Sequence, residues 1–106
     1  MNDITQDDLN QALKRHDNCV VLVYTNMCGT CESAKIMLDI VSKTMKHLLI
    51  YQLNVNHYPN IIEDYHITSI PCFLLFKEGK LVEQFYAFHS VTFLYQKFMK
   101  IFNDIF

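Results

Sequence analysis

One continuous apolar run constrains the fold of this chain more than any other feature. The run reads Cys19-Val20-Val21-Leu22-Val23-Tyr24 and shows no alternation of apolar and polar residues. An unbroken run rich in β-branched residues is typical of a strand that is covered on both faces. We therefore predict a central strand over residues 19–24, with helices packed against both sides of its sheet.

The segments around this run predict alternating helices and strands. Thr5 is a candidate N-cap for a helix over about 6–16, with Asp8 placed to complete a capping box. Apolar residues at helical spacing predict a helix from about 28 to 47, and a strand is expected over 48–55. A strand, a helix and a strand in this order favour a parallel pair joined by a right-handed crossover.

The following segment predicts a short helix and the first half of a hairpin. Pro59 fits the first turn of a short helix that continues through Tyr65. Pro71 then opens an apolar strand over 72–76, and Gly79 suits the turn that follows because it can adopt positive φ.

The C-terminal part predicts a returning strand over 81–87 and a closing helix capped by Ser90. The apolar stripe of that helix comprises Val91, Leu94, Phe98, Ile101, Phe102 and Ile105. The whole pattern predicts a single α/β domain over residues 1–106, with a mixed sheet of four or five strands and helices on both faces.

Composition and charge exclude several classes of protein. The chain is 51% hydrophobic, which excludes intrinsic disorder. Nine basic residues against eleven acidic ones, with no basic block, make a nucleic acid an unexpected partner. We find no apolar run of membrane-spanning length and no basic signal-peptide start. We therefore expect a cytoplasmic protein without a membrane partner.

The four cysteines, Cys19, Cys28, Cys31 and Cys72, fit neither of two common frameworks. A secreted disulfide scaffold usually has more cysteines in a smaller chain, and a structural zinc site usually has two close pairs. This chain has one close pair, Cys28-Gly29-Thr30-Cys31.

The predicted layout places this pair directly after the central strand, at the start of a helix. The unpaired amides and the dipole of a helix N-terminus favour a thiolate over a thiol. Cys28 is then the exposed nucleophile, Cys31 is the resolving thiol one turn later, and Gly29 allows close approach of the backbone. The alternative is a pair of small core cysteines.

Three separated segments resemble the thioredoxin family. The segment 26–31, Asn-Met-Cys-Gly-Thr-Cys, resembles the family's active site after its apolar strand. Segments 53–56 and 65–71 look like the middle of a thioredoxin, and 73–79 is similar to its closing hairpin. The resemblance implies a thioredoxin fold and a thiol–disulfide oxidoreductase that reduces protein or low-molecular-weight disulfides. It also implies no bound cofactor beyond the Cys28–Cys31 disulfide, and a separate reductase or small thiol as electron donor.

The resemblance also assigns supporting residues to the site. Pro71 matches the family's cis-proline, which lies beside the active-site disulfide and helps to hold the extended substrate chain. The positions that match the family's substrate-docking surface are Met27, Gly29, Thr30, Ser69 and Ile70. For Met27 and Ile70 the alternative is plain partial burial.

The sequence departs from the family pattern at positions that concern proton transfer. Leu22 stands where the family has a buried aspartate, and Gln52 stands in place of its lysine partner. Cys31 therefore lacks the usual group that removes its proton. Glu32 replaces a commonly basic residue and disfavours a thiolate at Cys28. We expect a slower or more specialised oxidoreductase.

Further departures affect substrate docking and redox potential. The chain has no tryptophan: Met27 precedes the first cysteine, and Tyr24 occupies another customary tryptophan position. Thr30 replaces the proline of the motif, which changes the redox potential in a direction that the sequence does not give.

Two other functions stay open from the sequence. The missing aspartate, lysine and tryptophan favour a redox-quiet adaptor of the same fold. A metal or iron–sulfur site would need further ligands beside Cys28 and Cys31, and Cys72 or a second chain would supply them.

The remaining cysteines and the last helix have simpler interpretations. Cys72, next to Pro71, is a core residue or a third redox thiol, and Cys19 is a core residue. The five histidines show no ligand spacing, and we assign no metal site. We expect a monomer, with a dimer through Phe93, Tyr95 and Phe106 as the alternative.

Overall fold

The computed structural model of this protein describes residues 1–86 and 90–103. The strands are β1 (Asn2–Asp3), β2 (Cys19–Tyr24), β3 (Leu49–Asn54), β4 (Cys72–Lys77) and β5 (Lys80–Tyr86). The helices are α1 (Gln6–Lys14), α2 (Gly29–Thr44), α3 (Asn60–Asp64) and α4 (Val91–Phe102). None of the helices in this described part is long and apolar enough to cross a membrane.

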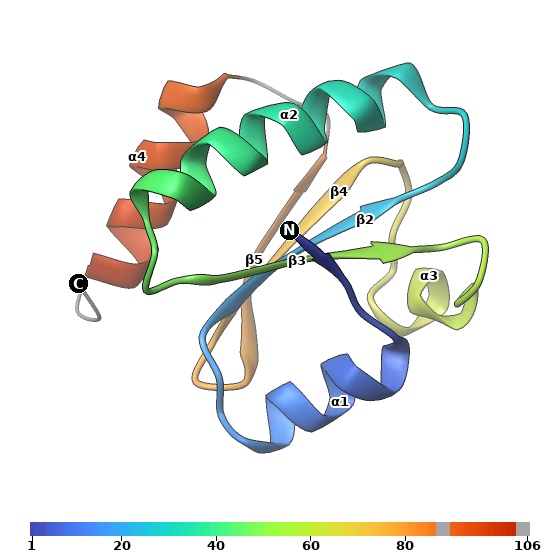
Figure 1. The fold of residues 1–106 in the computed structure, drawn as a ribbon. Helices are drawn as coiled ribbons and strands as arrows, with labels where there is room; N and C mark the ends of the chain where they lie inside the picture. Colours follow the sequence, from blue (N-terminus) through green and yellow to red (C-terminus); the bar gives the residue numbers. More distant parts are fainter. Residues whose placement is uncertain (87–89, 104–106) are drawn as a thin grey trace.

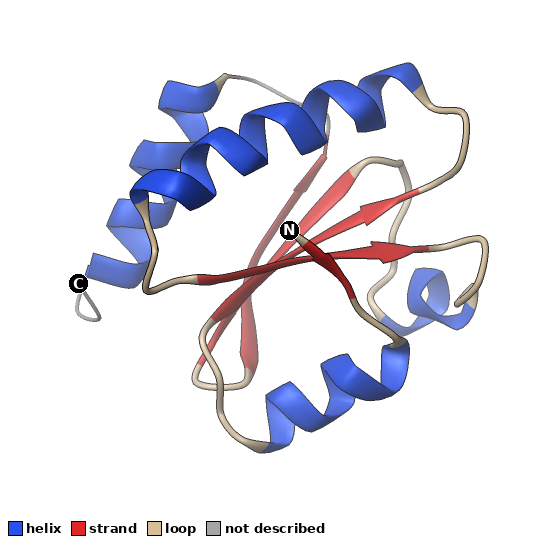
Figure 2. Ribbon diagram, viewed as in Figure 1, coloured by secondary structure: helices blue, strands red, loops and turns tan. Residues whose placement is uncertain are grey.

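The five strands form one mixed sheet with β2 at its centre. The strand order is β1-β3-β2-β4-β5. Strands β1, β3 and β2 are parallel, whereas β4 is antiparallel to both β2 and β5. Helices α2 and α4 cover one face of the sheet, and α1 and α3 cover the other (Figures 1 and 2). The predicted mixed sheet with helices on both faces is confirmed.

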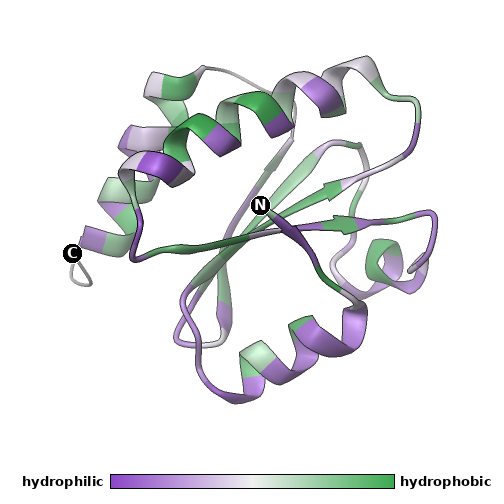
Figure 3. Ribbon diagram, viewed as in Figure 1, coloured by the Kyte–Doolittle hydropathy of each residue, from purple (hydrophilic) through white to green (hydrophobic). Residues whose placement is uncertain are grey.

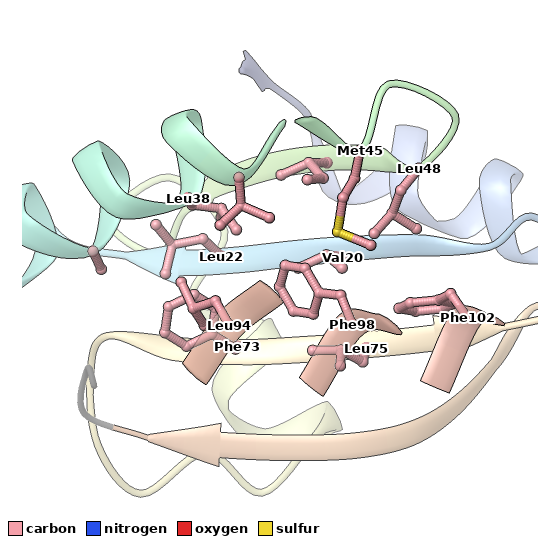
Figure 4. Packing of buried hydrophobic residues seen from close by; sticks show 13 residues of the cluster. Val20, Leu22, Leu38, Met45, Leu48, Phe73, Leu75, Leu94, Phe98 and Phe102 are labelled. Atoms are coloured by element: carbon pink, nitrogen blue, oxygen red, sulfur yellow. The ribbon is translucent and has the colours of Figure 1, made fainter. Parts of the chain in front are cut away.

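The unbroken apolar run is explained by burial of β2 on both faces. Val20 and Leu22 belong to a cluster that includes Leu38 of α2 and Phe98 of α4 (Figure 4). The alternate residues of β2 pack in a second cluster on the opposite face, with side chains from α1 and α3: Cys19, Val21, Val23, Leu9 and Ile61. In Figure 3 the central strands are mostly hydrophobic and α1 is mostly hydrophilic, as expected for a sheet between two layers of helices.

Local capping signals are confirmed at both ends of the chain. The Asp8 backbone N–H donates to Thr5 Oγ1 at 2.9 Å, and the Thr5 N–H donates to the Asp8 carboxylate at 3.0 Å. Ser90 Oγ accepts a hydrogen bond from the Phe93 N–H at 3.0 Å. Each bond satisfies an amide that has no partner within its own helix.

Gly79 occupies the predicted turn between β4 and β5 with a φ of 79°. A Cβ atom at this position would also clash with the backbone carbonyl oxygen of Leu13, because the turn lies against the end of α1. Both the backbone conformation and the close approach therefore require glycine here.

Several boundaries differ from the predicted ones. Strand β1 was not predicted, because two polar residues carry no pattern of their own and become a strand only by pairing with β3. Helix α2 ends at Thr44 rather than near residue 47, since Met45 leaves the helical region with a ψ of 66°. The predicted positions Ala87, Ile105 and Phe106 lie outside the described residues.

Candidate active site

The cysteine pair lies where β2 ends and α2 begins. Cys28 is the N-cap of α2 and has an extended backbone conformation. Cys28 is partly exposed, whereas Cys31, in the first turn of the helix, is fully buried. Both are free thiols. One sulfur is thus open to a substrate, and the other lies beneath it in the protein.

Two hydrogen-bonding groups converge on the Cys28 sulfur. The Cys31 backbone N–H donates to Cys28 Sγ at 3.3 Å, and the Thr30 hydroxyl lies 3.3 Å from the same sulfur. Hydrogen bonding from the Cys31 side chain, and then from Thr30, lowers the pKa of Cys28 below its ordinary value. A sulfur that caps a helix in this way is stabilised as a thiolate.

Cys31 has the opposite environment. Burial is the main cause that raises the pKa of Cys31 to about 11, and the side-chain hydrogen bond to Cys28 adds to this effect. A backbone hydrogen bond from Thr25 and the positive charge of Lys35 act in the other direction. The two thiols therefore differ in the way that a nucleophile and a resolving thiol require.

The sheet register brings the predicted docking residues to the same edge. Val23 pairs with Cys72, so the residues just before Cys72 lie at the end of the sheet where the cysteine loop leaves β2. The Ile70–Pro71 peptide bond is cis, Pro71 is buried and Ser69 is exposed. Gly29 and Thr30 are exposed on the first turn of α2.

Met27 and Ile70, the two apolar residues predicted to dock substrate, differ in their exposure to solvent. Met27 is fully exposed, at 105% of its reference area, and its backbone has a φ of 53°. Plain burial is therefore wrong for Met27. Ile70 is half-buried and packs against the second cluster, which agrees with partial burial, and its docking role stays a prediction.

The interior beneath Cys31 has no carboxylate. Leu22 is fully buried in the first cluster, and Gln52, its register partner on β3, donates through its side chain to Asp3 at 2.8 Å. No polar or charged residue is buried among residues 1–86 and 90–103. The structure thus places an apolar side chain where the family resemblance implies a proton acceptor.

Four residues near the pair form a connected group, and the sequence analysis assigned no role to two of them, Lys35 and Asp3. The Lys35 ammonium lies 3.6 Å from the centre of the Tyr24 ring and 3.4 Å from the Glu32 carboxylate. The Tyr24 hydroxyl donates to Asp3. The spacing of Cys31 and Lys35, one helical turn apart, was a usable signal for Lys35. No local signal joins Asp3 to Tyr24.

A group of asparagines fixes the loop before Cys28. Asn56 Oδ1 accepts from the Asn26 N–H at 2.9 Å and from the Thr25 hydroxyl at 2.7 Å. Asn54 Nδ2 donates to Asn26 Oδ1 at 2.9 Å. These bonds join the ends of the parallel strands β2 and β3, so they hold the segment that presents Met27 and Cys28.

The other two cysteines belong to the core. Cys19 and Cys72 are fully buried in the second cluster, and burial is the main cause that raises the pKa of each to about 12. The core interpretation is confirmed for Cys19, and it is the favoured one for Cys72. No group of three or more histidine, cysteine or acidic side chains suited to a metal ion occurs in the part of the chain that the structure describes.

Comparison with known proteins agrees with this geometry. Residues 1–100 match the family model described as Thioredoxin. The chain is 49% identical over 80 residues to the thioredoxin-like protein YusE of Bacillus subtilis, covering 76% of each protein. It is 30% identical over 81 residues to the thioredoxin of Rickettsia felis, covering 74% of this chain and 77% of that protein.

Solved structures show the same fold at low sequence identity. Mitochondrial thioredoxin 3 of Saccharomyces cerevisiae, in its oxidized form, matches with a TM-score of 0.83 and 21% identity over 94% of each chain. The thioredoxin of Trypanosoma brucei brucei matches with a TM-score of 0.83 and 14% identity, covering 95% of this chain and 89% of that one.

Proposed function

This chain belongs to the thioredoxin family and is a thiol–disulfide oxidoreductase with the thioredoxin fold, and we propose that it reduces disulfides of proteins or low-molecular-weight compounds through Cys28 and Cys31. The observation that carries the proposal is the contrast between the two sulfurs. Cys28 is partly exposed with a lowered pKa, and Cys31 is buried with a pKa raised to about 11.

The first step is attack of the Cys28 thiolate on a substrate disulfide. A bond forms between Cys28 Sγ and one substrate sulfur, the substrate S–S bond breaks, and the other sulfur leaves as a thiolate that takes a proton from solvent. The N–H of Cys31 and the Thr30 hydroxyl, each 3.3 Å from Cys28 Sγ, stabilise its charge before the attack.

The second step releases the reduced substrate. Cys31 gives its proton to solvent and attacks Cys28 Sγ, the bond to the substrate breaks, and the second substrate sulfur leaves as a thiolate. Two electrons have then passed to the substrate, and Cys28 and Cys31 form a disulfide. A reductase or a small thiol returns two electrons to complete the cycle.

Substrate docking is proposed for the surface that surrounds Cys28. Met27 projects fully into solvent beside it, and Ser69, Ile70 and Pro71 lie at the same edge of the sheet. An extended substrate segment that contacts Met27 and Ile70 brings its disulfide to Cys28. We also propose that the protein needs no bound cofactor and acts in the cytoplasm.

The test is to stop the cycle between the two steps. A Cys31→Ser variant incubated with an oxidised peptide or with glutathione disulfide is expected to accumulate a mixed disulfide on Cys28, detected by mass spectrometry. The wild-type protein with a thiol donor is expected to turn the same substrates over, and Cys28→Ser is the inactive control. Absence of any adduct on Cys31→Ser would contradict the proposal.

A further inference from the structure

We propose that Lys35, seated on the Tyr24 ring, supplies the positive charge that stabilises the Cys31 thiolate in the resolving step. This inference rests on the proposed function, because it concerns the second step of that cycle. Leu22 beneath the pair is apolar and cannot accept a proton from Cys31. The charge of Lys35 compensates in part for this missing proton acceptor.

Helix geometry places Lys35 beside Cys31. Residues four positions apart on a helix are neighbours on one face, with Cβ atoms about 5–6 Å apart. Cys31 and Lys35 stand in this relation in α2. The Lys35 side chain is only 22% exposed, so its charge is less screened by solvent than that of an ordinary surface lysine.

The Tyr24 ring determines where the Lys35 ammonium lies. The ammonium is 3.6 Å from the ring centre, within the range of a cation–π contact. Tyr24 is 7% exposed and its hydroxyl donates to Asp3, which also accepts a hydrogen bond from Gln52. The ring is thus fixed by bonds to β1, and it holds the lysine close to the helix.

The groups that act on the ionisation of Cys31 include one cation, Lys35. Cys28, the N-cap of α2, and Lys35 within α2 act on Cys31 directly. Glu32 of α2 and Tyr24 of β2 contact Lys35, and Asp3 of β1 accepts the hydrogen bond of Tyr24. Burial and Cys28 oppose ionisation of Cys31, whereas the backbone hydrogen bond from Thr25 and then the charge of Lys35 favour it. Glu32, 3.4 Å from Lys35, offsets part of this charge.

The resolving step is where this charge matters. Once Cys28 is bonded to a substrate sulfur, its own negative charge is gone, and burial remains as the main obstacle to ionisation of Cys31. A thiolate must form there, losing its proton to solvent, before it attacks Cys28 Sγ and displaces the substrate thiolate. A cation one turn away lowers the pH at which that thiolate forms.

The experiment measures resolution of a mixed disulfide across pH. Cys28 is loaded with thionitrobenzoate, and release of the coloured thiolate by Cys31 is followed by rapid mixing. Lys35→Met keeps the aliphatic stem on Tyr24 but removes the charge, and Lys35→Arg keeps the charge. Lys43→Gln is the matched control, because Lys43 lies on the same helix and is paired with Asp39 in solvent.

For Lys35→Met we expect the pH midpoint of release to rise by about 0.5 to 1 pH unit, which slows release about three- to tenfold below the midpoint. Lys35→Arg and Lys43→Gln should keep the wild-type midpoint, and Glu32→Gln should lower it. Equal slowing of Lys35→Met at every pH, or an unchanged midpoint, would overturn the role of Lys35 and leave the proposed function intact. A wild-type adduct that never releases the coloured thiolate would overturn both.

A direct titration separates ionisation from reaction. The pH dependence of Cys31 alkylation in a Cys28→Ser background does not require resolution to occur. We expect Lys35→Met to shift this profile upward in that background, and an unshifted profile would overturn the inference.

Discussion

Cys28 Sγ accepts a hydrogen bond from the backbone N–H of Cys31 at 3.3 Å, so the sulfur that we propose as nucleophile is the N-cap of the helix that carries the second sulfur. A sulfur in this position replaces the Ser or Asp oxygen that usually satisfies the amides of the first turn. Folding of α2 and activation of Cys28 therefore depend on the same contact.

The Thr30 hydroxyl should contribute to the reactivity of Cys28. Thr30→Val keeps the branched shape but removes the hydroxyl that lies 3.3 Å from Cys28 Sγ, so the pKa of Cys28 should rise toward its ordinary value. We expect alkylation of Cys28 at neutral pH to slow by about threefold, the effect of losing one modest hydrogen bond to the thiolate. Rates of iodoacetamide labelling across pH give the measurement. Thr30→Ser should retain the wild-type profile, and an unchanged profile in Thr30→Val would show that the hydroxyl is not involved.

A substitution of Met27 should impair the reaction with large substrates and leave the reaction with small ones unchanged. Met27→Asn removes the exposed apolar side chain and suits the φ of 53°, because asparagine tolerates the left-handed region. We expect a severalfold loss in the second-order rate with an apolar peptide disulfide, and no loss with a small aromatic disulfide reagent. The midpoint temperature of thermal unfolding should be unchanged or slightly higher. Equal losses with both substrates would contradict a docking role.

The two core cysteines should make the fold sensitive to alkaline pH. Burial raises the pKa of Cys19 and Cys72 to about 12, from an ordinary value of 9.0. Below pH 9 both folded and unfolded chains keep these protons, so neither thiol affects stability. Above it the unfolded chain loses them first, and stability falls as pH rises toward 12.

We expect each buried thiol to remove about 2 kcal/mol of unfolding free energy between pH 9 and pH 10.5. Urea unfolding of the wild type and of the Cys19→Ala/Cys72→Ala variant would measure this. The variant is less stable at pH 7 because its core is smaller, but its stability should decline less with pH. If the unfolding free energies of the wild type and the variant fell equally with pH, these thiols would ionise equally in the folded and unfolded states.

The sequence predicts those parts of the fold that are determined by the residues of one short segment. The apolar run of β2, the capping box at Thr5 and the turn at Gly79 are each predicted by a local sequence pattern, and the packed structure contains all three. The roles that we propose for Cys28 and Cys31 were predicted from their spacing and from the strand before them. Strand β1 carries no such signal, since its two residues pair with β3 only in the folded chain.

The residues that surround the cysteine pair are held by contacts between segments that are distant in sequence, which the sequence alone does not predict. Asp3, Tyr24 and Lys35 come from three elements, and only the sheet order places β1 and β2 on either side of β3, so that the Tyr24 hydroxyl reaches Asp3. For Met27 the family resemblance predicted a docking position, but the local residue pattern left partial burial as the alternative. An apolar residue between a strand and a helix is usually partly buried, and the positive φ of the loop turns this one outward.

A reversible two-electron couple between Cys28 and Cys31 is required for the proposed cycle, and its redox midpoint is the most direct test. The protein would be equilibrated in graded dithiothreitol buffers and alkylated, and its disulfide pairing read by mass spectrometry. We predict one couple that joins only Cys28 and Cys31, with a midpoint near about −270 mV, as for a reductant of the thioredoxin kind. A midpoint of about −120 to −180 mV would contradict the reducing direction. No reversible disulfide between these two residues would contradict the account as a whole.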